Sequence, residues 1–474
     1  MARSSSRPRL LHTAILMLLL VVLNPIARAT SEGLYRYNEA SEVVTDASGR
    51  IRGATRRTDK DFIVGGLFPL HSEDAASAGG RCGSIRSEQL MEAMLFALDR
   101  INADTELLQS IELGYDIRDT CFSENIGLDE ALDLIVSGER LDVGSCSCDT
   151  GNASETINTV GIVGAGASKV SVPVASLGRL FEMPQVCYAS SSPILSNRDR
   201  YTYFYRTIPP DSIQAKVMVD LMLWFNWTHI STVYSDDAYG QPGIAALQEL
   251  AEDNGICIDV NEGIGEGFVE DDYEALAMKL NASAANTVVL FAHDQHVEQL
   301  LEKVRNISVE RRFIWIASDT WSRSVAIANK FNETVAGMYG VSPFSSYIQE
   351  FQHYLSQLTI QGNLRNPWFS EIFASYAECD YRQNATDTSM NACDKNSNIT
   401  HFSHYGQSNL VPLTIDAVYT FAHALDDFLM DNCNPFIPPK EQTPPILLIF
   451  FNIPFNGAYF CWEGEERVRV AEAL

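Results

Sequence analysis

A short segment of small residues opens a predicted helix and could bind an anion. Gly164-Ala165-Gly166-Ala167-Ser168 comes directly after a predicted strand. Its free backbone N–H groups and the positive end of the helix dipole would bind a small anion such as a carboxylate. The alternative is a tight strand-to-helix turn without a ligand. The segment lacks the third glycine of a dinucleotide fingerprint, because Lys169 takes that position, and it is not a P-loop.

Hydroxyl groups cluster in a second segment, Tyr188 to Ser192, after a predicted strand over residues 184–187. Neighbouring hydroxyls, such as those of Ser190 and Ser191, could hydrogen-bond both ends of a zwitterion. Helix N-capping by serine explains this segment equally well. The sequence alone leaves both interpretations open.

Asp211, Tyr239 and Asp319 each lie at the end of a predicted strand or the start of a predicted helix. An acid there can simply cap the helix. A buried carboxylate is also a natural partner for an ammonium group. The three residues are therefore candidates for binding an amine.

The N-terminus has the pattern of a secretory signal peptide over residues 1–29. Three arginines precede an apolar run, residues 14–23, and the small-residue exit Ala27-Arg28-Ala29 follows. The apolar run is too short for a membrane anchor, which needs about 20 residues. The longest late apolar stretch, Ile446–Phe451, is shorter still. The pattern predicts a chain in the secretory pathway, extracellular as given.

The composition narrows the possible functions. A formal charge of −27 disfavours binding to nucleic acid, because phosphates would be repelled. Seven N-x-[ST] sequons predict a glycosylated surface; they are at Asn152, Asn226, Asn281, Asn306, Asn332, Asn384 and Asn398. The ten cysteines are disulfide candidates in an oxidising compartment, and Cys146-Ser147-Cys148 is spaced too tightly for a zinc site. We expect no metal and no cofactor.

Short β-branched apolar runs alternate with amphipathic helical patterns from Phe62 onward, which predicts βαβ units with parallel sheets. The predicted strands are Phe62–Phe68, Thr159–Val163, His229–Tyr234, Thr287–Phe291 and Phe313–Ala317. There are too many units for one sheet, so we predict an α/β fold of two doubly wound lobes with a ligand between them. The predicted segments are a polar leader at 30–60, lobe 1 at 61–205, lobe 2 at 206–343, a return to lobe 1 at 344–433 and an atypical or truncated tail at 434–474.

Seven motifs in the same order make the region from about Asp61 to Cys433 resemble the amino-acid-binding ectodomain of metabotropic glutamate receptors, the class C G-protein-coupled receptors. The motifs are Gly66-Leu67-Phe68-Pro69-Leu70-His71, Glu92-Ala93-Met94, Ile101-Asn102-Ala103-Asp104, Ile117-Arg118-Asp119-Thr120-Cys121, Phe225-Asn226-Trp227-Thr228, Arg365-Asn366-Pro367-Trp368-Phe369 and Ile415-Asp416-Ala417-Val418-Tyr419.

The resemblance implies a periplasmic-binding-protein type I clamshell, or Venus flytrap, that closes on an α-amino acid. In that family the position of Ser168 binds the ligand carboxylate, and the positions of Ser190 and Ser191 bind the carboxylate and the amine. The matches to Asp211, Tyr239 and Asp319 on lobe 2 bind the amine as the lobes close. These residue types are chemically preserved here, with Ser191 in place of the usual threonine.

The distal end of the site departs from the family. Glutamate receptors hold the distal carboxylate with an arginine and a lysine, whose positions fall here on Leu90 and Leu410. Burial of a carboxylate against leucine without a cation would be unfavourable by several kcal/mol. The chain in this respect resembles the insect mangetout-type orphan subgroup, so we expect glutamate to be a poor ligand. The sequence does not identify the amino acid that binds.

The cysteines fit the same resemblance, which implies disulfides Cys82–Cys121 and Cys379–Cys393. Cys257 matches a position that bonds to a cysteine-rich domain downstream. Cys146 and Cys148 fall in the loop where the family forms its intersubunit disulfide, which implies a covalent homodimer. The partners of Cys187, Cys433 and Cys461 stay open.

Three functional classes compete. The favoured one is the ligand-sensing ectodomain of a class C receptor, which would couple to a G protein only through a membrane domain absent from this chain. The second is a soluble amino-acid-binding or decoy form. The third, an enzyme such as a secreted hydrolase, is disfavoured because there is no G-x-S-x-G motif and no histidine lies in a motif that pairs it with a nucleophile.

Overall fold

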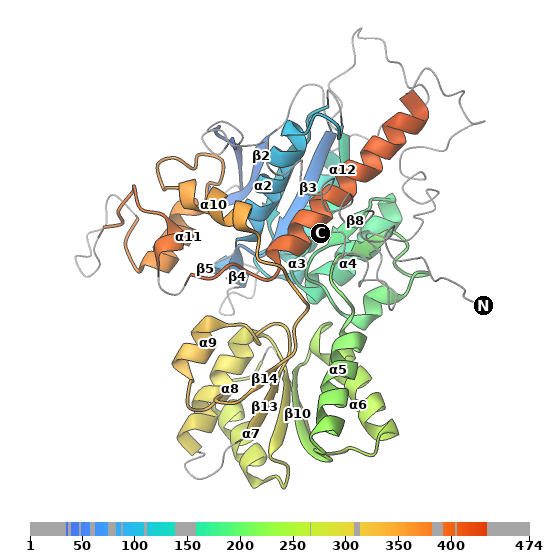
Figure 1. The fold of residues 1–474 in the computed structure, drawn as a ribbon, viewed down its shortest axis with the longest axis vertical. Coiled ribbons are helices and arrows are strands. Elements are labelled where there is room, and N and C mark those ends of the chain that lie inside the picture. Colours follow the sequence, from blue (N-terminus) through green and yellow to red (C-terminus); the bar gives the residue numbers. More distant parts are fainter. Residues whose placement is uncertain are drawn as a thin grey trace, which may run out of the picture.

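A computed structural model describes residues 35–433 apart from 37–38, 47–48, 57–61, 74–81, 87–88, 109–110, 138–157, 266, 308–312, 382–391 and 403–404. The predicted signal peptide, the predicted C-terminal tail, the Cys146/Cys148 segment and the sequons at Asn152 and Asn384 lie outside the described residues. Figure 1 shows two lobes joined by extended segments, with the chain entering the second lobe before helix α5 and leaving it after strand β14.

A seven-stranded sheet with strand order β1-β2-β6-β3-β7-β8-β9 forms the centre of lobe 1. From β6 to β9 all neighbouring strands are parallel, whereas β1 and β2 add an antiparallel edge. The strands are β1 Glu42–Thr45, β2 Ile51–Arg56, β3 Phe62–Phe68, β6 Gly114–Asp119, β7 Asn158–Val163, β8 Gln185–Cys187 and β9 Phe204–Arg206. A two-stranded ribbon, β4 His71–Glu73 with β5 Cys82–Ile85, lies outside this sheet. Strand β3 is a continuous apolar run because it is buried on both faces.

Helices cover both faces of this sheet, and part of the cover comes from the last third of the described chain. The helices are α2 Leu90–Ala103, α3 Glu124–Ser137, α4 Ser168–Phe181, α10 Gln349–Gln357, α11 Phe369–Ala377 and α12 Val411–Cys433, with 3-10 turns η2 Pro193–Ser196 and η3 Ile399–His401. Apolar residues of α10, α11 and α12 share one core with those of α2 and β3. The chain therefore returns to lobe 1 after lobe 2.

Lobe 2 is built on a five-stranded, wholly parallel sheet with order β11-β10-β12-β13-β14. The strands are β10 His229–Ser235, β11 Cys257–Ile264, β12 Thr287–Phe291, β13 Ile314–Ala317 and β14 Tyr339–Gly340. The helices are α5 Asp211–Trp224, α6 Gly240–Asp253, α7 Glu270–Ala282, α8 Asp294–Ile307 and α9 Val325–Lys330. Separate apolar clusters on the two faces of the sheet form its core.

These observations confirm the predicted α/β fold of two doubly wound lobes. The predicted strands 62–68 and 287–291 have the observed bounds, and the other three differ by one residue. The parallel strands were recognisable because burial on both faces demands continuous apolar runs. None of the described helices is both long enough and apolar enough to cross a bilayer.

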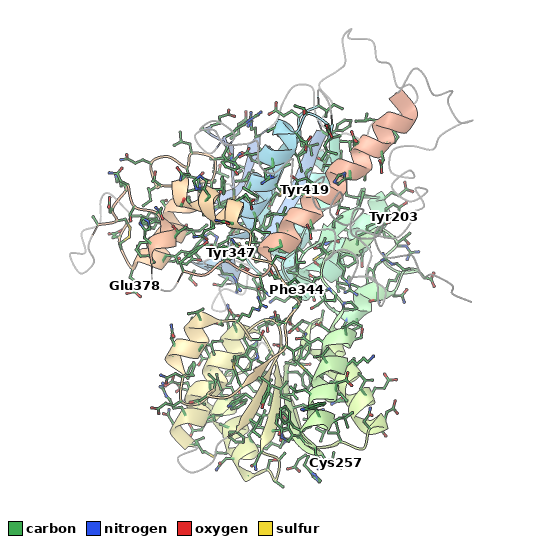
Figure 2. All side chains as sticks on the ribbon, in the orientation of Figure 1. Tyr203, Cys257, Phe344, Tyr347, Glu378 and Tyr419 are labelled. Atoms are coloured by element: carbon green, nitrogen blue, oxygen red, sulfur yellow. A yellow bond between two sulfur atoms is a disulfide. The ribbon has the colours of Figure 1, made fainter. Side chains whose placement is uncertain are left out.

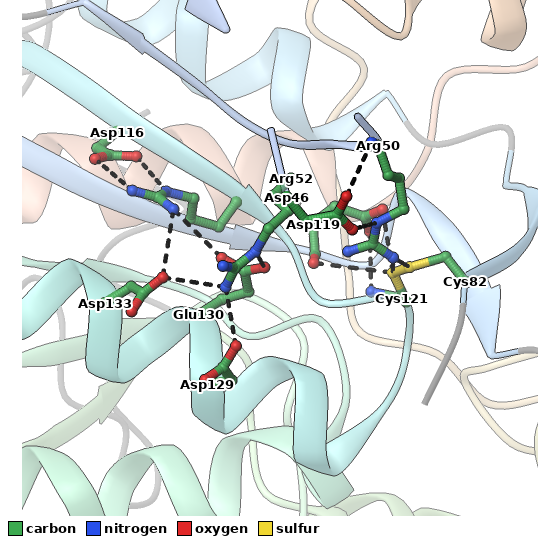
Figure 3. A network of polar contacts seen from close by, with 11 residues as sticks. Asp46, Arg50, Arg52, Cys82, Asp116, Asp119, Cys121, Asp129, Glu130 and Asp133 are labelled. Carbon is green, nitrogen blue, oxygen red and sulfur yellow. Dashed lines mark hydrogen bonds and ion pairs between the residues drawn. A yellow bond between two sulfur atoms is a disulfide. The ribbon is translucent and has the colours of Figure 1, made fainter. Parts of the chain in front are cut away.

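The predicted polar leader over residues 30–60 is wrong where the structure describes it. Residues 42–45 and 51–56 form β1 and β2, which pair with each other, and β2 also pairs with β6 of the main sheet. Figure 3 shows how this polar segment is attached to the fold: Arg52 of β2 donates to Glu130 of α3 (2.6 Å) and to Asp129 (2.9 Å). The edge is attached by ion pairs rather than by an apolar run, so hydrophobic periodicity did not reveal it.

Candidate ligand-binding site

The turn after β7 brings a helix N-terminus to the carboxyl edge of the lobe 1 sheet. Gly164 has φ +121°, and a Cβ there would lie 2.4 Å from the carbonyl oxygen of Leu67, so the turn requires glycine. Helix α4 then begins at Ser168, and its N-cap residue Ala167 provides no side-chain cap. The first N–H groups of a helix have no intrahelical acceptor. This end of α4 is therefore able to bind an anion.

The turn after β8 lies beside this helix start. The backbone N–H of Ser192 donates to the Ser168 hydroxyl (3.3 Å), which is buried. Arg206 of β9 donates to the carbonyl oxygens of Ser190 (3.4 Å) and Ser192 (2.9 Å) and so fixes the path of the loop. Burial lowers the pKa of Arg206 to about 10, and the nearby Asp211 carboxylate opposes this shift.

Ser190 has its hydroxyl engaged inside lobe 1. It donates to the Ala165 carbonyl oxygen (3.2 Å) and lies 2.7 Å from the Ser171 hydroxyl. The side chain is fully buried. Of the two serines predicted to bind ligand in this loop, Ser190 therefore has the more structural role.

Three predicted residues of lobe 2 lie together. Asp211 is the first residue of α5, Tyr239 is the N-cap of α6 and Asp319 follows β13. The Tyr239 hydroxyl donates to Asp319 Oδ1 (2.6 Å). The amide nitrogen of Gln214 lies 2.9 Å from Asp211 Oδ1 and 3.2 Å from Asp319 Oδ1, so one amide group bridges the two carboxylates.

Burial raises the pKa of both carboxyl groups. For Asp211 the burial is complete, and the negative charge of Asp319 adds to the rise. For Asp319 the hydrogen bonds from Tyr239 and Gln214 oppose the effect of burial. Burial and the same two carboxylates raise the pKa of Tyr239 well above its usual value. The site accumulates negative charge and contains no cation that pairs directly with either carboxylate among the described residues.

Polar atoms without partners gather where the two lobes meet. The backbone N–H of Asp211 donates to the Ser191 carbonyl oxygen (2.8 Å), which joins α5 to the serine loop. Asp211 Oδ2 and the hydroxyl oxygens of Ser191 and Ser192 are buried, yet none has a hydrogen-bond partner among the described residues. The Ser191 hydroxyl lies close enough to lower the pKa of Asp211, but without hydrogen-bond geometry. Buried polar groups of this kind are rare in native proteins and require an explanation.

The lobes also touch directly beside the acidic residues. The Phe122 ring of lobe 1 meets the His293 ring of lobe 2 edge-on at a centroid distance of 5.2 Å. Arg86 covers the Phe122 ring at 4.8 Å and lies 3.8 Å from the Asp294 carboxylate. His293 in turn lies 5.1 Å from the Tyr239 ring. Contact between the lobes is thus continuous with a residue of the predicted amine site.

The two positions predicted to determine selectivity pack in the apolar core of lobe 1. Leu90 begins α2 and is buried, and Leu410 precedes α12 and packs against the same core. The neighbouring Gln89 is occupied by neutral partners: its amide nitrogen donates to the Gly406 carbonyl oxygen (2.7 Å), and its amide oxygen accepts from Ser408 N–H (3.2 Å). Arg86, the cation that precedes α2 in the sequence, contacts Asp294 and Phe122 and not the leucine positions.

Both predicted disulfides are present, Cys82–Cys121 and Cys379–Cys393. Cys187 is buried, whereas Cys257 is an exposed free cysteine at the start of β11, at the base of lobe 2 (Figure 2). Asp119 lies beside Cys82 and Cys121 in an arrangement that resembles a metal site. The two sulfurs are bonded to each other, so this group has no thiolates to offer a metal.

The sequence interpretation missed Gln214, Arg206 and the contact between Phe122 and His293. Gln214 lies one helical turn after Asp211, so its position on the same face of a predicted helix was an available signal. Arg206 and the Phe122–His293 pair had no comparable signal, because their partners are distant in sequence.

Comparisons with known proteins agree with this geometry. Residues 89–446 match the family model described as receptor family ligand binding region. The chain is 34% identical over 417 residues to metabotropic glutamate receptor 4 of Macaca fascicularis, covering 85% of this chain and 45% of that receptor. It is 33% identical over 416 residues to human metabotropic glutamate receptor 8 (85% and 46%) and 32% identical over 407 residues to the metabotropic glutamate receptor of Drosophila melanogaster (81% and 42%).

The chain belongs to the receptor family ligand binding region, because the family model covers most of its length. Within that family it is similar to the metabotropic glutamate receptors and corresponds to a ligand-binding region of a class C receptor. The chain spans less than half the length of these relatives. The relatives are receptors and not enzymes.

Proposed function

We propose that this region binds a free α-amino acid between its lobes and that the ligand favours the closed arrangement. The observation that carries the proposal is the group of buried polar atoms without partners, Asp211 Oδ2 and the hydroxyls of Ser191 and Ser192. A zwitterion would supply the donors and acceptors that this group lacks. Burial without partners is unfavourable by about 1–3 kcal/mol for each group, so a ligand that satisfies them gains affinity.

The ammonium group of the ligand binds Asp211, Asp319 and Tyr239. Two buried carboxylates that share one amide donor have a strong preference for a cation between them. An ammonium offers three donors. Asp211 Oδ2 and the Ser191 hydroxyl can accept from it, and the Tyr239 ring provides a side wall close to Asp319.

The carboxylate of the ligand binds the start of α4. The uncapped N–H groups and the helix dipole favour an anion there, with Ser168 and Ser191 as side-chain donors. The two ends of the ligand would thus contact different lobes. A ligand with more contacts in the closed state than in the open one shifts the population toward closure, which in a full-length receptor would be the signal.

The distal part of the ligand carries no carboxylate. Leu90 and Leu410 lie where the resemblance places the cations that bind a distal carboxylate. A carboxylate against these leucines would lose its hydration without a compensating ion pair. We therefore propose a ligand other than glutamate.

A thermal-shift panel of free amino acids tests the proposal. At a concentration of 100 times Kd, a ligand stabilises by about 2.7 kcal/mol, which corresponds to a rise in Tm of about 5–10 °C for a lobe of roughly 150–250 residues. The matched controls are the N-acetyl and methyl-ester derivatives of the amino acid that responds, which lose the ammonium or the carboxylate and should shift nothing. The absence of a shift with every amino acid would contradict the proposal.

The exclusion of glutamate is tested by the double substitution Leu90→Arg with Leu410→Lys. The variant should gain a glutamate-dependent shift that the native protein lacks, because the cations can pair with the distal carboxylate. Leu90→Met with Leu410→Met keeps both positions apolar and is the control. If the native protein binds glutamate as well as the charged variant does, the account is wrong.

We also propose that the region forms a homodimer through α3 and α4. The outer face of α3 exposes three apolar side chains at intervals of one turn, and α4 adds one that is 74% exposed; they are Leu128, Leu132, Val136 and Leu180. Exposed apolar groups of this kind mark interaction surfaces. Helix α3 leads directly into the segment that contains Cys146 and Cys148, which supports a disulfide next to the same surface.

The dimer is tested by two variants. Cys146→Ser with Cys148→Ser should convert a disulfide-linked dimer on a non-reducing gel into a monomer band. Leu132→Glu with Leu180→Glu should then reduce the remaining noncovalent dimer in light scattering, since it places charges in the apolar contact. A native chain that is monomeric at micromolar concentration would contradict the proposal.

A further inference from the structure

Lobe 2 has a highly solvent-exposed tryptophan at the end of helix α5. Trp224, the last residue of α5, is 85% exposed, more than any other large apolar side chain in the described part of the protein. It makes no ring stacking or cation–π contact within the described residues. The aromatic residues around it do have partners, because Phe225 stacks on Trp227 at 4.8 Å and both contact Tyr339. Leu223 (44% exposed) and Phe225 (41%) flank it, so the end of α5 presents a small apolar patch rather than one isolated side chain, and such patches mark interaction surfaces.

The chain just after this tryptophan has a fixed path. Asn226 has φ +55°, its N–H donates to the Leu223 carbonyl oxygen (3.1 Å), and the N–H of Trp227 donates to the Met222 carbonyl oxygen (2.8 Å). These two bonds form a Schellman motif with Asn226 in the left-handed position, which asparagine tolerates. The side chain of Asn226 is exposed, and so is Thr228. Asn226-Trp227-Thr228 is thus an accessible, well-ordered sequon.

We propose that Asn226 carries an N-linked glycan whose first N-acetylglucosamine packs on the indole face of Trp224. The Cα atoms of two residues at this separation lie at most about 7 Å apart, within reach of a sugar attached to the asparagine side chain. The faces of aromatic rings carry negative potential and attract the polarised C–H groups of a sugar ring. The glycan would cover an apolar surface that is otherwise in water.

The pairing is specific to this sequon among the exposed ones of lobe 2. Asn281 and Asn332 each have a lysine two residues before, Lys279 and Lys330, and Asn306 has the buried Val304. Only Asn226 has an aromatic residue there. Strand β10 begins just after this sequon, and His229 pairs with Cys257, which Figure 2 places at the base of lobe 2. The glycan would therefore lie away from lobe 1 and from the ligand site.

A four-protein cycle tests the contact: native chain, Trp224→Ala, Thr228→Ala and the double variant, all secreted from a glycosylating host. Thr228→Ala removes the glycan but leaves Asn226 in its left-handed position. We expect Trp224→Ala to lower the Tm by about 2–4 °C in the glycosylated chain and by less than about 1 °C in the Thr228→Ala background. Trp224→Phe, which keeps an aromatic face, should restore most of the loss.

Glycopeptide mass spectrometry gives a second measurement, the occupied fraction of Asn226, and we expect Trp224→Ala to lower it. The matched control is Lys330→Ala, two residues before Asn332, which should leave the occupancy of Asn332 unchanged. An unoccupied Asn226 in the native chain would overturn the proposal. So would an equal loss of Tm in both backgrounds, which would place the role of Trp224 in a protein contact rather than a glycan contact.

Discussion

Two groups of buried polar side chains differ in how completely they are satisfied. In lobe 1, Arg365 donates to both oxygens of Asp99 (2.7 and 2.9 Å). Glu92 accepts from Tyr354 (2.6 Å) and from Asn363 (2.7 Å). Each carboxylate oxygen in this group has a partner, and the one unpaired atom is Arg365 Nε. We call Glu92, Asp99, Tyr354, Asn363, Asn366 and Arg365 the lobe 1 clamp.

The proposed ligand site differs, because several of its buried polar atoms have no hydrogen-bond partner in the described part of the chain. Asp211 and Asp319 share one amide donor, and Asp211 Oδ2 and the hydroxyls of Ser191 and Ser192 have none among the described residues. The clamp pairs Asp99 with a guanidinium and gives Glu92 three neutral donors, whereas the site places two acids side by side. Like charges in a buried position lower stability unless a cation joins them.

The difference separates a structural group from the group that we propose binds ligand. The clamp connects α2 to residues 354–366 and so holds the returning part of the chain on lobe 1. Three of its residues, Glu92, Arg365 and Asn366, lie in motifs that carry the family resemblance, and none of the six is among the predicted ligand-binding residues. Two of the motifs that carry the resemblance thus contribute to the architecture, whereas the incomplete group is the one to which we assign ligand binding.

The largest effect is expected from Arg365→Ala. Removal of one partner of a buried ion pair leaves an uncompensated charge and lowers stability by about 3–5 kcal/mol. Urea unfolding of lobe 1 measures the loss. Arg323→Ala, at an exposed arginine of lobe 2, is the control and should change stability by less than about 0.5 kcal/mol. If Arg365→Ala unfolds at the same urea concentration as the native chain, the clamp does not stabilise lobe 1.

For the proposed ligand site we expect a substitution to affect the response to ligand and not the stability. Asp319→Asn keeps an acceptor for the Tyr239 hydroxyl but removes one of two adjacent negative charges. We expect the ligand-free Tm to stay the same or rise slightly, because repulsion with Asp211 is relieved, and the ligand-dependent shift of about 5–10 °C to disappear. The exposed Asp220→Asn on the same lobe should retain that shift. A variant that loses ligand-free stability instead would assign Asp319 to the scaffold.

The sequence located the candidate residues better than it located the contacts between them. Strand ends and helix starts could be located from apolar runs, and Asp211, Tyr239 and Asp319 lie at such positions and come together in the structure. Helical spacing could have placed Gln214 beside Asp211, but its contact with Asp319, 105 residues away, and the internal bonds of Ser190 are not encoded by any periodicity. The edge strands of residues 42–56 were missed for a similar reason, because ion pairs of Arg52 rather than apolar residues attach them.

The smallest expected effect is a pH dependence of stability that arises from His71. Like the clamp, this side chain has hydrogen-bonded partners. His71 lies 2.6 Å from Asp119 and 3.5 Å from Glu371. Burial alone would lower its pKa, but the hydrogen bonds with these two acids raise the pKa of His71 to about 9. Because the folded value lies above the usual 6.5, the stabilisation is complete below about pH 6.5 and is lost as the pH rises through 9.

We therefore expect the native chain to lose about 2 kcal/mol between pH 6.5 and 9 relative to His71→Gln, which has no proton to lose. The measurement is the difference between the two unfolding free energies across this range, so that contributions from other groups cancel. Glu371→Gln should reduce the difference in part, since it removes one of the two acids that hold the proton. A constant difference from pH 6.5 to 9 would mean that His71 is already neutral in the folded protein. Its contacts with Asp119 and Glu371 would then not form a charged, satisfied group of the kind found in the clamp.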